Sequence, residues 1–381
     1  MDNQALAQCR LCESFSVINL LELNNMPSQA QYFPINSIDA SLMKTNFDIG
    51  QCIDCGLVQI LGEPVSYYKE VVRSNRVSGA LRKFRLNQLD TFIKKYRLEN
   101  RLLIEVGCGD GDVLDLIREL QFDSHGIEYR EEFVNRLRNE GFTVHKGYVA
   151  DSQFSIPNMK YDAFLSFNVL EHSPNPKTFL KGMRALLKPE AIGLIEVPNL
   201  DMILSKNMLS EFMLEHLCYF TRETLRLTLE SSGFQVLGIE NVWHDYLISA
   251  TVKNRPTLSF EQEKISWDTL KNEMHFLLSS YSKNKICVWS AGHQSLATLS
   301  MLEIEDRIQF IVDNSLSKQG KYAPGSGIPI VAPEILRKSE EISCVIVLGG
   351  SYTQEIVDVL RGTFSQKLKI ITLLSTKIHI S

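Results

Sequence analysis

Glu105-Val106-Gly107-Cys108-Gly109-Asp110-Gly111 decides the fold of this 381-residue chain. The apolar run Leu102-Leu103-Ile104 leads into it as a strand, and a helix is expected to follow. Glycines at such a turn let a ligand lie against bare backbone. Glu128 ends the next apolar stretch, where a carboxylate can accept hydrogen bonds from both ribose hydroxyls. The pattern predicts a nucleoside-binding βαβ unit, and the alternative is an ordinary glycine-rich turn.

The glycine pattern also indicates which nucleoside is bound. It has no phosphate-binding lysine of a P-loop, and it is not the full G-x-G-x-x-G dinucleotide pattern. S-adenosylmethionine has no phosphates and carries an amine, which an acidic residue at the start of the turn can face. The string resembles the first motif of class I S-adenosylmethionine-dependent methyltransferases. Five residues are therefore expected to bind this cofactor: Glu105, Gly107, Gly109, Gly111 and Glu128.

Composition restricts the partners. A net charge of -5 and a pI near 6.0 offer no attraction to polyanions, so no nucleic-acid substrate is expected. No apolar run approaches the ~18 residues that span a bilayer, and the N-terminus has no signal-peptide pattern. We therefore expect a cytoplasmic protein without a membrane partner. The sequence leaves its oligomeric state open.

Four of the eight cysteines form two C-x-x-C pairs, Cys9 with Cys12 and Cys52 with Cys55. In a reducing compartment two such pairs favour a closed, tetrahedral structural zinc site over disulfides, which remain the alternative. Asn24-Asn25, Met26-Pro27 and Glu63-Pro64 suggest that the segment to about residue 75 is loop-rich. We expect zinc to supply much of its folding free energy.

Residues 102–197 alternate apolar strands with helical patterns of about ten residues. Such alternation predicts an α/β fold with a mostly parallel, doubly wound sheet, whose ligand lies at the carboxyl ends of the strands. A second Rossmann-like pattern begins beyond residue 255, with sparse glycines that favour a degenerate fold reused for substrate binding over an independent dinucleotide site. We therefore expect three domains: a zinc-binding domain at 1–77, a methyltransferase core at 78–254 and a C-terminal Rossmann-like domain at 255–381.

Two histidines fall near the same sheet edge. Asn168 and His172 follow the fourth strand of the core, which places Asn168 at the cofactor and His172 beside the transferred methyl group. Glu215-His216 lies in the loop after the fifth strand, and the carboxylate of Glu215 is able to orient an imidazole or raise its basicity. The alternatives are a surface histidine without a role and a charged loop pair.

The chain as a whole resembles the zinc-containing sugar C-methyltransferases. The resemblance rests on the four cysteines, the N-V-L-E-H and E-H-x-x-Y-F strings, and residues 318–325, which read K-Q-G-K-Y-A-P-G. It implies methylation of C3 of a nucleotide-linked deoxy-4-ketosugar, with His216 as the base and His172 and Glu215 lining the reaction centre. It further implies that Lys318, Lys321 and Tyr322 bind the nucleotide diphosphate, although a solvated basic loop is the alternative.

The chain departs from the family pattern at three places. Met213 stands where the family has a tyrosine, and the register of a second family tyrosine falls near Val72-Arg73, without an aromatic residue. The family's histidine-glycine-glycine-serine string reads His244-Asp245-Tyr246-Leu247, which leaves His244 as a substrate-binding candidate. These departures leave O- or N-methylation as a rival function. A non-catalytic zinc- and cofactor-binding scaffold is the second rival.

Overall fold

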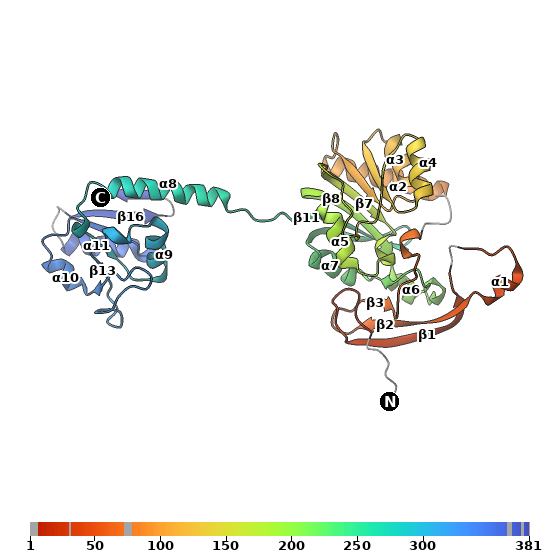
Figure 1. The fold of residues 1–381 in the computed structure, drawn as a ribbon, viewed down its shortest axis with the longest axis horizontal. Coiled ribbons are helices and arrows are strands. Elements are labelled where there is room, and N and C mark those ends of the chain that lie inside the picture. Colours follow the sequence, from red (N-terminus) through yellow and green to blue (C-terminus); the bar gives the residue numbers. More distant parts are fainter. Residues whose placement is uncertain (1–6, 30–31, 72–77, 364–367, 375–376, 381) are drawn as a thin grey trace, which may run out of the picture. The chain divides into compact units, whose positions relative to one another are not determined.

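The computed structural model describes residues 7–29, 32–71, 78–363, 368–374 and 377–380. It divides into two compact units, Met1–Thr257 and Leu258–Ser381 (Figure 1). The first unit contains both the cysteine-bearing segment and the core that follows it. No helix in the described ranges is long and apolar enough to cross a membrane.

A seven-stranded sheet forms the centre of the first unit, in the order β10-β11-β8-β7-β4-β5-β6. Neighbouring strands from β8 to β6 are parallel, whereas β11 pairs antiparallel with both β8 and β10. The strand bounds are β4 Leu103–Val106, β5 Ser124–Glu128, β6 Thr143–Lys146, β7 Tyr161–Phe167, β8 Leu187–Pro198, β10 Phe234–Val242 and β11 Leu247–Asn254. This mostly parallel sheet confirms the predicted class I α/β fold.

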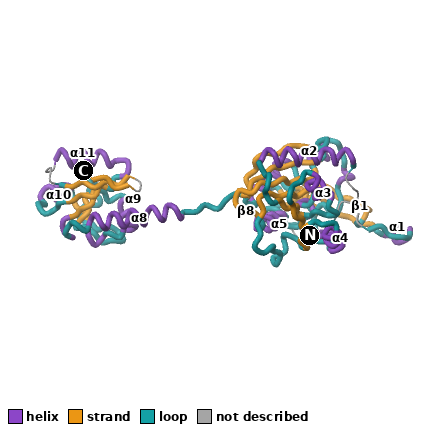
Figure 2. The backbone as a smooth tube through the Cα atoms, turned by 90° about the horizontal axis from the view of Figure 1, so that it is seen from above, coloured by secondary structure: helices purple, strands orange, loops and turns teal. Residues whose placement is uncertain are grey.

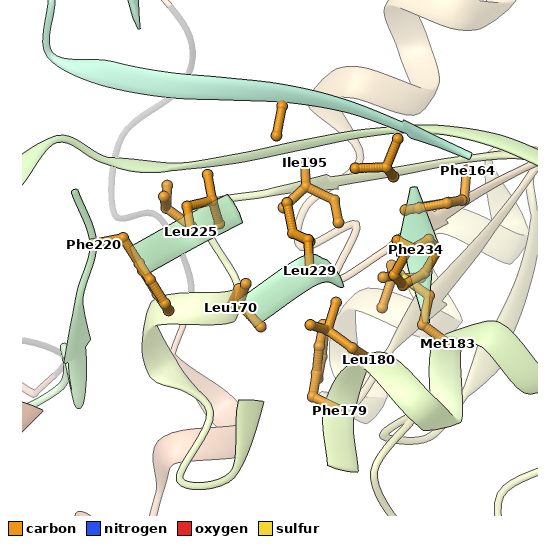
Figure 3. Packing of buried hydrophobic residues seen from close by; sticks show 14 of the residues in the cluster. Phe164, Leu170, Phe179, Leu180, Met183, Ile195, Phe220, Leu225, Leu229 and Phe234 are labelled. Carbon is orange, nitrogen blue, oxygen red and sulfur yellow. The ribbon is translucent and has the colours of Figure 1, made fainter. Parts of the chain in front are cut away.

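Helices cover both faces of the sheet because successive residues of a strand point to opposite sides. On β4, Leu103 packs with the residues of α2 and α3, while Ile104 packs with those of α5 and α7. Figure 3 shows the second core, which includes Phe179 and Leu229. The helices are α2 Gly79–Tyr96, α3 Asp112–Glu119, α4 Glu131–Asn139, α5 Pro176–Ala185, α6 Leu200–Ser205 and α7 Arg222–Ser231.

The cysteine-bearing segment is a sheet rather than the loop-rich region that its sequence suggested. Its strands are ordered β1-β2-β3-β9, with bounds β1 Val17–Pro27, β2 Lys44–Cys52, β3 Val58–Ile60 and β9 Cys218–Tyr219, and α1 Ser37–Leu42 lies between β1 and β2. Asn24-Asn25 and Met26-Pro27 lie inside β1 (Figure 1). The prediction was wrong because pairing with β2 holds β1 extended, and a register irregularity between Leu23 and Met26 accommodates the left-handed Asn25. Glu63-Pro64 does lie outside the strands.

The second unit contains the expected Rossmann-like sheet (Figure 2), ordered β14-β13-β12-β15-β16-β17. All its pairs are parallel except β16 with β17. One core packs α8 and α9 on the sheet and the other packs α10 and α11. The bounds are α8 Glu261–Leu278, β12 Ile286–Trp289, α9 His293–Leu302, β13 Phe310–Val312, β14 Ile330–Val331, α10 Pro333–Lys338, β15 Cys344–Val347, α11 Thr353–Thr363, β16 Lys369–Leu374 and β17 Lys377–Ile380.

Candidate active site

The main cleft of the first unit lies at the carboxyl ends of β4, β5 and β7. The turn after β4 forms one wall, and Gly107 in it has φ of 78°. A Cβ atom on Gly107 would lie 2.5 Å from Cγ2 of Val169, which also lines the cleft, so the position has no room for a side chain. Gly111 does not line the cleft. It is the N-cap residue of α3, with φ of 92°, and a Cβ atom on it would collide with the side chain of Leu137.

Glu128 lies at the end of β5, almost fully buried, and lines the cleft. Its Oε2 accepts a 2.9 Å hydrogen bond from the backbone N–H of Gly109, and its Oε1 accepts one of 2.8 Å from that of Arg130. Burial raises the pKa of this carboxyl group, while these backbone donors oppose the shift. Each carboxylate oxygen has a second lone pair. Both can therefore accept ligand hydroxyls while the protein keeps its own two bonds.

Two further buried groups on the cleft wall lack partners. Oε2 of Glu105 and Oδ1 of Asn168 have no hydrogen-bond partner in the described part of the chain. Glu105 ends β4, and Asn168 follows β7 with a left-handed φ of 57°. A buried polar atom left unsatisfied is costly. Both atoms are therefore suited to a ligand that supplies donors.

Arg85 is a cleft residue that the sequence reasoning missed. It lies on α2, is 2% exposed, and its Nη2 is 2.5 Å from Oε2 of the buried Glu196 on β8. Its guanidinium carbon is 4.2 Å from the ring centroid of Phe167. A signal was present, since Arg85 is four residues from both Leu81 and Leu89 and so shares the buried face of its helix.

Residues before the core also reach the cleft. Tyr68 and Lys69, in the 3-10 helix η1 (Tyr68–Glu70), both line it. The ring of Tyr68 meets that of Tyr148 edge-on at 5.9 Å, and Nζ of Lys69 lies 5.2 Å from the Tyr148 centroid and 2.6 Å from Oδ1 of Asp151. These contacts attach the end of the cysteine-bearing segment to the core. No local pattern in the sequence marks them.

His172 and His216 form a half-buried pair at the end of this cleft. His172 ends the 3-10 helix η2 (Leu170–His172) and lines the cleft, and the two imidazole centroids are 4.8 Å apart at an interplanar angle of 69°. Nδ1 of His172 donates to the backbone oxygen of Glu215 at 2.7 Å. Burial lowers the pKa of both imidazoles, and that of His216 well below its ordinary value, with the neighbouring His172 adding to the shift. The lowered pKa values favour the neutral form of both rings, although Glu215 opposes the shift at His172.

The carboxylate of Glu215 has a partner that the sequence did not indicate. Its Oε1 accepts a 3.0 Å hydrogen bond from the hydroxyl of Tyr67, and Glu215 is 2% exposed. Met213, which replaces a family tyrosine, donates its backbone N–H to the hydroxyl of Tyr219 at 2.9 Å. Val72-Arg73, where the second tyrosine was sought, lies outside the described residues.

Four thiols converge in the cysteine-bearing segment. Sγ of Cys9 is 3.5 Å from Sγ of Cys55, Sγ of Cys12 is 3.5 Å from Sγ of Cys52, and all four sulfurs lie within 4.8 Å of one another. These separations are too long for disulfides and match the edges of a tetrahedron of thiolates about zinc. Backbone N–H groups of Leu11 and Cys12 point at Sγ of Cys9. The donor set fits a structural zinc ion.

This cluster lies one strand away from the histidine pair. β3 pairs with β9, which begins two residues after His216, and the N–H of Ile60 donates to the backbone oxygen of Leu217 at 3.1 Å. The β2–β3 turn carries Cys55, so the cluster fixes the strand that holds β9. No local pattern in the sequence indicates this link between the cysteines and His216.

The remaining candidates lie apart from the cleft walls. His244 is exposed in the turn between β10 and β11, at the carboxyl edge of β8, in ring contact with Trp243. Lys318, Lys321 and Tyr322 belong to the second unit. There Nζ of Lys318 donates to the backbone oxygen of Ala291 and lies 3.1 Å from Oδ2 of Asp313. Lys321 and Tyr322 are exposed.

Comparison with known proteins identifies the chemistry. Residues 80–239 match a methyltransferase domain family, and residues 258–374 match the C-methyltransferase C-terminal domain. The chain is 22% identical over 389 residues to the C-methyltransferase NovU of Streptomyces niveus, across 92% of this chain and 91% of that protein. The chain is an S-adenosylmethionine-dependent methyltransferase. The match of its C-terminal domain and the NovU alignment support membership of the C-methyltransferase family.

Two other similar proteins align with less than half of this chain. A probable S-adenosylmethionine-dependent methyltransferase of Mycolicibacterium smegmatis is 26% identical over 149 residues, which is 39% of this chain and 58% of that protein. The crystal structure of a methyltransferase from Archaeoglobus fulgidus superposes on 45% of this chain and 96% of its own, at 20% identity and a TM-score of 0.36.

S-adenosylmethionine fits the residues of the cleft. The unsatisfied Oε2 of Glu105 suits the ammonium group of its methionine part, and the free lone pairs of Glu128 suit the ribose. Gly107 leaves room for the ligand to lie on the backbone. His172 lines the same cleft beyond Asn168.

We expect Glu128→Ala to weaken S-adenosylmethionine binding at least tenfold, since each hydrogen bond to a charged group is worth about 1.5–3 kcal/mol. Isothermal titration calorimetry measures the change. Glu128→Gln is the matched control, because it keeps the size and one acceptor oxygen and should lose less. Because Glu128 also holds Gly109, a melting curve must show that the variant is folded. Equal affinity for wild type and Glu128→Ala would remove Glu128 from the site.

Cofactor affinity should rise with pH between about pH 6 and 7.5, where the ammonium group of the cofactor stays protonated. Burial raises the pKa of Glu105 to about 8, with Asp112, Glu128 and Asp110 adding to the shift and Arg85 opposing it. Glu105 is thus mostly protonated below pH 8 and must release its proton to pair with the ammonium. The expected rise is at most about tenfold per pH unit.

The matched variant for this prediction is Glu105→Gln. It should bind more weakly and with little pH dependence, measured by calorimetry in buffers of different ionisation enthalpy. An unchanged pH slope in Glu105→Gln would show that another group releases the proton.

Proposed function

We propose that this methyltransferase methylates a carbon atom next to a ketone in a nucleotide-linked deoxysugar, with His216 as the general base. The observation that carries the proposal is the half-buried imidazole of His216, whose pKa is lowered by burial of the ring and by His172, in ring contact with that cleft residue. A neutral imidazole accepts a proton, whereas an imidazolium cannot. A C–H bond beside a ketone is acidic enough for such a base because the carbonyl oxygen takes up the charge.

His216 takes the proton, and the C–H electron pair becomes the double bond of an enolate. Bound S-adenosylmethionine supplies an electrophilic methyl group on sulfur. The enolate carbon forms the new C–C bond while the sulfur keeps the electron pair of the broken bond. His172, with Nδ1–H committed to Glu215, presents its other nitrogen as a neutral acceptor beside the reacting carbon. Leu170 and Leu217, the chain neighbours of Glu171 and His216, are both buried.

Tyr67 is proposed to replace the family tyrosine sought near Val72-Arg73. Its hydroxyl donates to Glu215, which adjoins the base, and burial with the nearby carboxylate raises its pKa. Because a phenol has only one O–H, Tyr67 must turn this O–H from Glu215 to the substrate before it can donate a hydrogen bond to an enolate oxygen. Tyr67 is therefore the phenol that we propose acts at the reaction centre, although Met213 replaces one family tyrosine.

The nucleotide-linked substrate class is supported by the C-methyltransferase C-terminal domain and by the basic loop of the second unit. Lys321 and Tyr322 are exposed and able to contact a diphosphate, while Lys318 is restrained by Asp313. His244 is proposed to contact the sugar from the β10–β11 turn. Zinc bound by the four cysteines is proposed to be structural, because four thiolates leave no open position for a substrate.

The test is an acceptor series: a nucleotide-linked 4-ketosugar and its 4-hydroxy and 4-amino analogues, each with S-adenosylmethionine. S-adenosylhomocysteine should form only with the ketosugar, and NMR should place the new methyl on the carbon next to the carbonyl. A product methylated on oxygen or nitrogen would replace this proposal with an O- or N-methyltransferase. No turnover with any of the three acceptors would reject the nucleotide ketosugar class.

A further inference from the structure

Glu171 is a buried carboxylate to which the sequence assigned no role. It lies in η2 directly before His172 and is 1% exposed. A carboxylate oxygen of Glu171, a ring nitrogen of His172 and a ring nitrogen of His216 all lie within 4.8 Å of one another. Glu171 therefore places a carboxylate oxygen near the proposed base from a different segment of the chain.

The same hydrophobic core holds both segments of this group. Leu170, which precedes Glu171, and Phe220, which follows β9, are both buried in the cluster that Figure 3 shows. Cys218 Sγ lies within hydrogen-bonding distance, 3.8 Å, of the backbone oxygen of Ser173, next to His172. The side chains of Glu171 and His216 are thus held by rigid neighbours on two sides.

His172 and Glu215, which lie beside His216, both make hydrogen bonds within the protein. The Nδ1–H of His172 donates to the backbone oxygen of Glu215, and the carboxylate of Glu215 accepts the hydroxyl of Tyr67. A carboxylate next to an imidazole fixes the ring's tautomer and stabilises the imidazolium that forms when the ring accepts a proton. Among the carboxylates near His216, the geometry favours Glu171 for this task.

We propose that Glu171, rather than Glu215, is the carboxylate that positions His216 and stabilises its protonated form during proton abstraction. The proposal rests on the proposed role of His216 as base. Glu171 acts through His216 and is a positioning residue. When the ring accepts a proton from the substrate, a neutral imidazole and an existing carboxylate become an ion pair, so the new positive charge on the ring is balanced where it forms.

Other titratable groups also face His216. His172 lies in ring contact and lowers its pKa, Tyr219 has its ring centroid 6.0 Å away, and Glu215 precedes it in the chain. The effect of Glu171 must therefore be separated from theirs. Glu215→Gln provides the matched control, because both carboxylates are almost fully buried and the substitution has the same size.

We expect Glu171→Gln to lower kcat by about 10- to 100-fold with little change in KM, and to move the pH–rate profile, as loss of a neighbouring anion lowers an imidazole pKa. Proton abstraction needs the unprotonated ring, so the acid limb should shift to lower pH. Glu215→Gln should leave the position of that limb unchanged. An equal shift in both variants, or none in Glu171→Gln, would overturn the proposal.

A second measurement needs no methyl acceptor. The ¹⁵N NMR signals of the His216 ring, assigned by their loss in His216→Asn, should show one tautomer in the wild type and a mixture in Glu171→Gln. An unchanged ring spectrum in Glu171→Gln would overturn the proposal. If the tautomer changes but the wild type fails to catalyse substrate proton exchange, the pairing stands and the proposed reaction fails.

Metal analysis tests whether Glu171, His172 and His216 instead bind a metal ion. The three groups are also a possible ligand set for a metal ion. One zinc per chain, unchanged in Glu171→Gln, supports the pairing. A second metal ion that Glu171→Gln removes would overturn it, because His216 would then be a ligand and not a base.

Discussion

His216→Ala should lower kcat by about 100-fold or more while S-adenosylmethionine affinity changes little. The imidazole lies beyond the walls of the cofactor cleft, so its removal acts on the chemical step. The variant should also lose exchange of the proton next to the ketone with deuterated solvent. This exchange requires the base and no methyl transfer, and mass spectrometry of the recovered ketosugar measures it.

Two variants make the test sharper. His216→Asn keeps a polar side chain at this half-buried position, so a loss of exchange there cannot be attributed to a cavity. His379→Ala removes an exposed histidine of β17 and should behave as the wild type. Exchange at the wild-type rate in His216→Ala would transfer the role of base to His172. A wild-type enzyme that methylates without any exchange would favour an O-methyltransferase.

Cys52→Ser should abolish stoichiometric zinc and unfold most of the β1-β2-β3 sheet, since apparent binding energies of structural zinc reach about 10–16 kcal/mol in small domains. Activity should fall as well, because β3 would no longer hold β9 and the loop that carries His216. Mass-spectrometric zinc analysis, circular dichroism melting and turnover measure the three effects. Full zinc occupancy in a normally folded Cys52→Ser would disprove the four-cysteine site.

The control for this variant is Cys344→Ser, which alters a buried thiol on β15 of the second unit. It carries the cost of burying a hydroxyl but leaves the zinc ligands in place. Zinc content should stay at one per chain. If activity falls equally in both variants, general destabilisation rather than zinc loss explains the effect.

Several features could be predicted from the sequence because they depend on residues that are close in the chain. The turn at Gly107 and the carboxylate of Glu128 follow from one strand–turn–helix pattern and the next strand end. The C-x-x-C spacing brings Cys9 near Cys12 whatever the rest of the chain does, and the regular alternation of strands and helices fixed the α/β class. In each case the deciding interactions join residues close in the chain.

Long-range pairing decided the rest. β1 is a strand, despite its asparagines, because β2 lies beside it, and β9 joins the cysteine-bearing sheet across some 160 residues of chain. The carboxylate near His216 is another feature that long-range contacts decide. Sequence adjacency favoured Glu215, yet the fold directs Glu215 to Tyr67 and brings Glu171 to the imidazoles. The sequence by itself determined the glycine-rich turn and the two C-x-x-C pairs, whereas only the tertiary structure decided which acid, phenol and strand surround His216, because those contacts join segments that no local pattern connects.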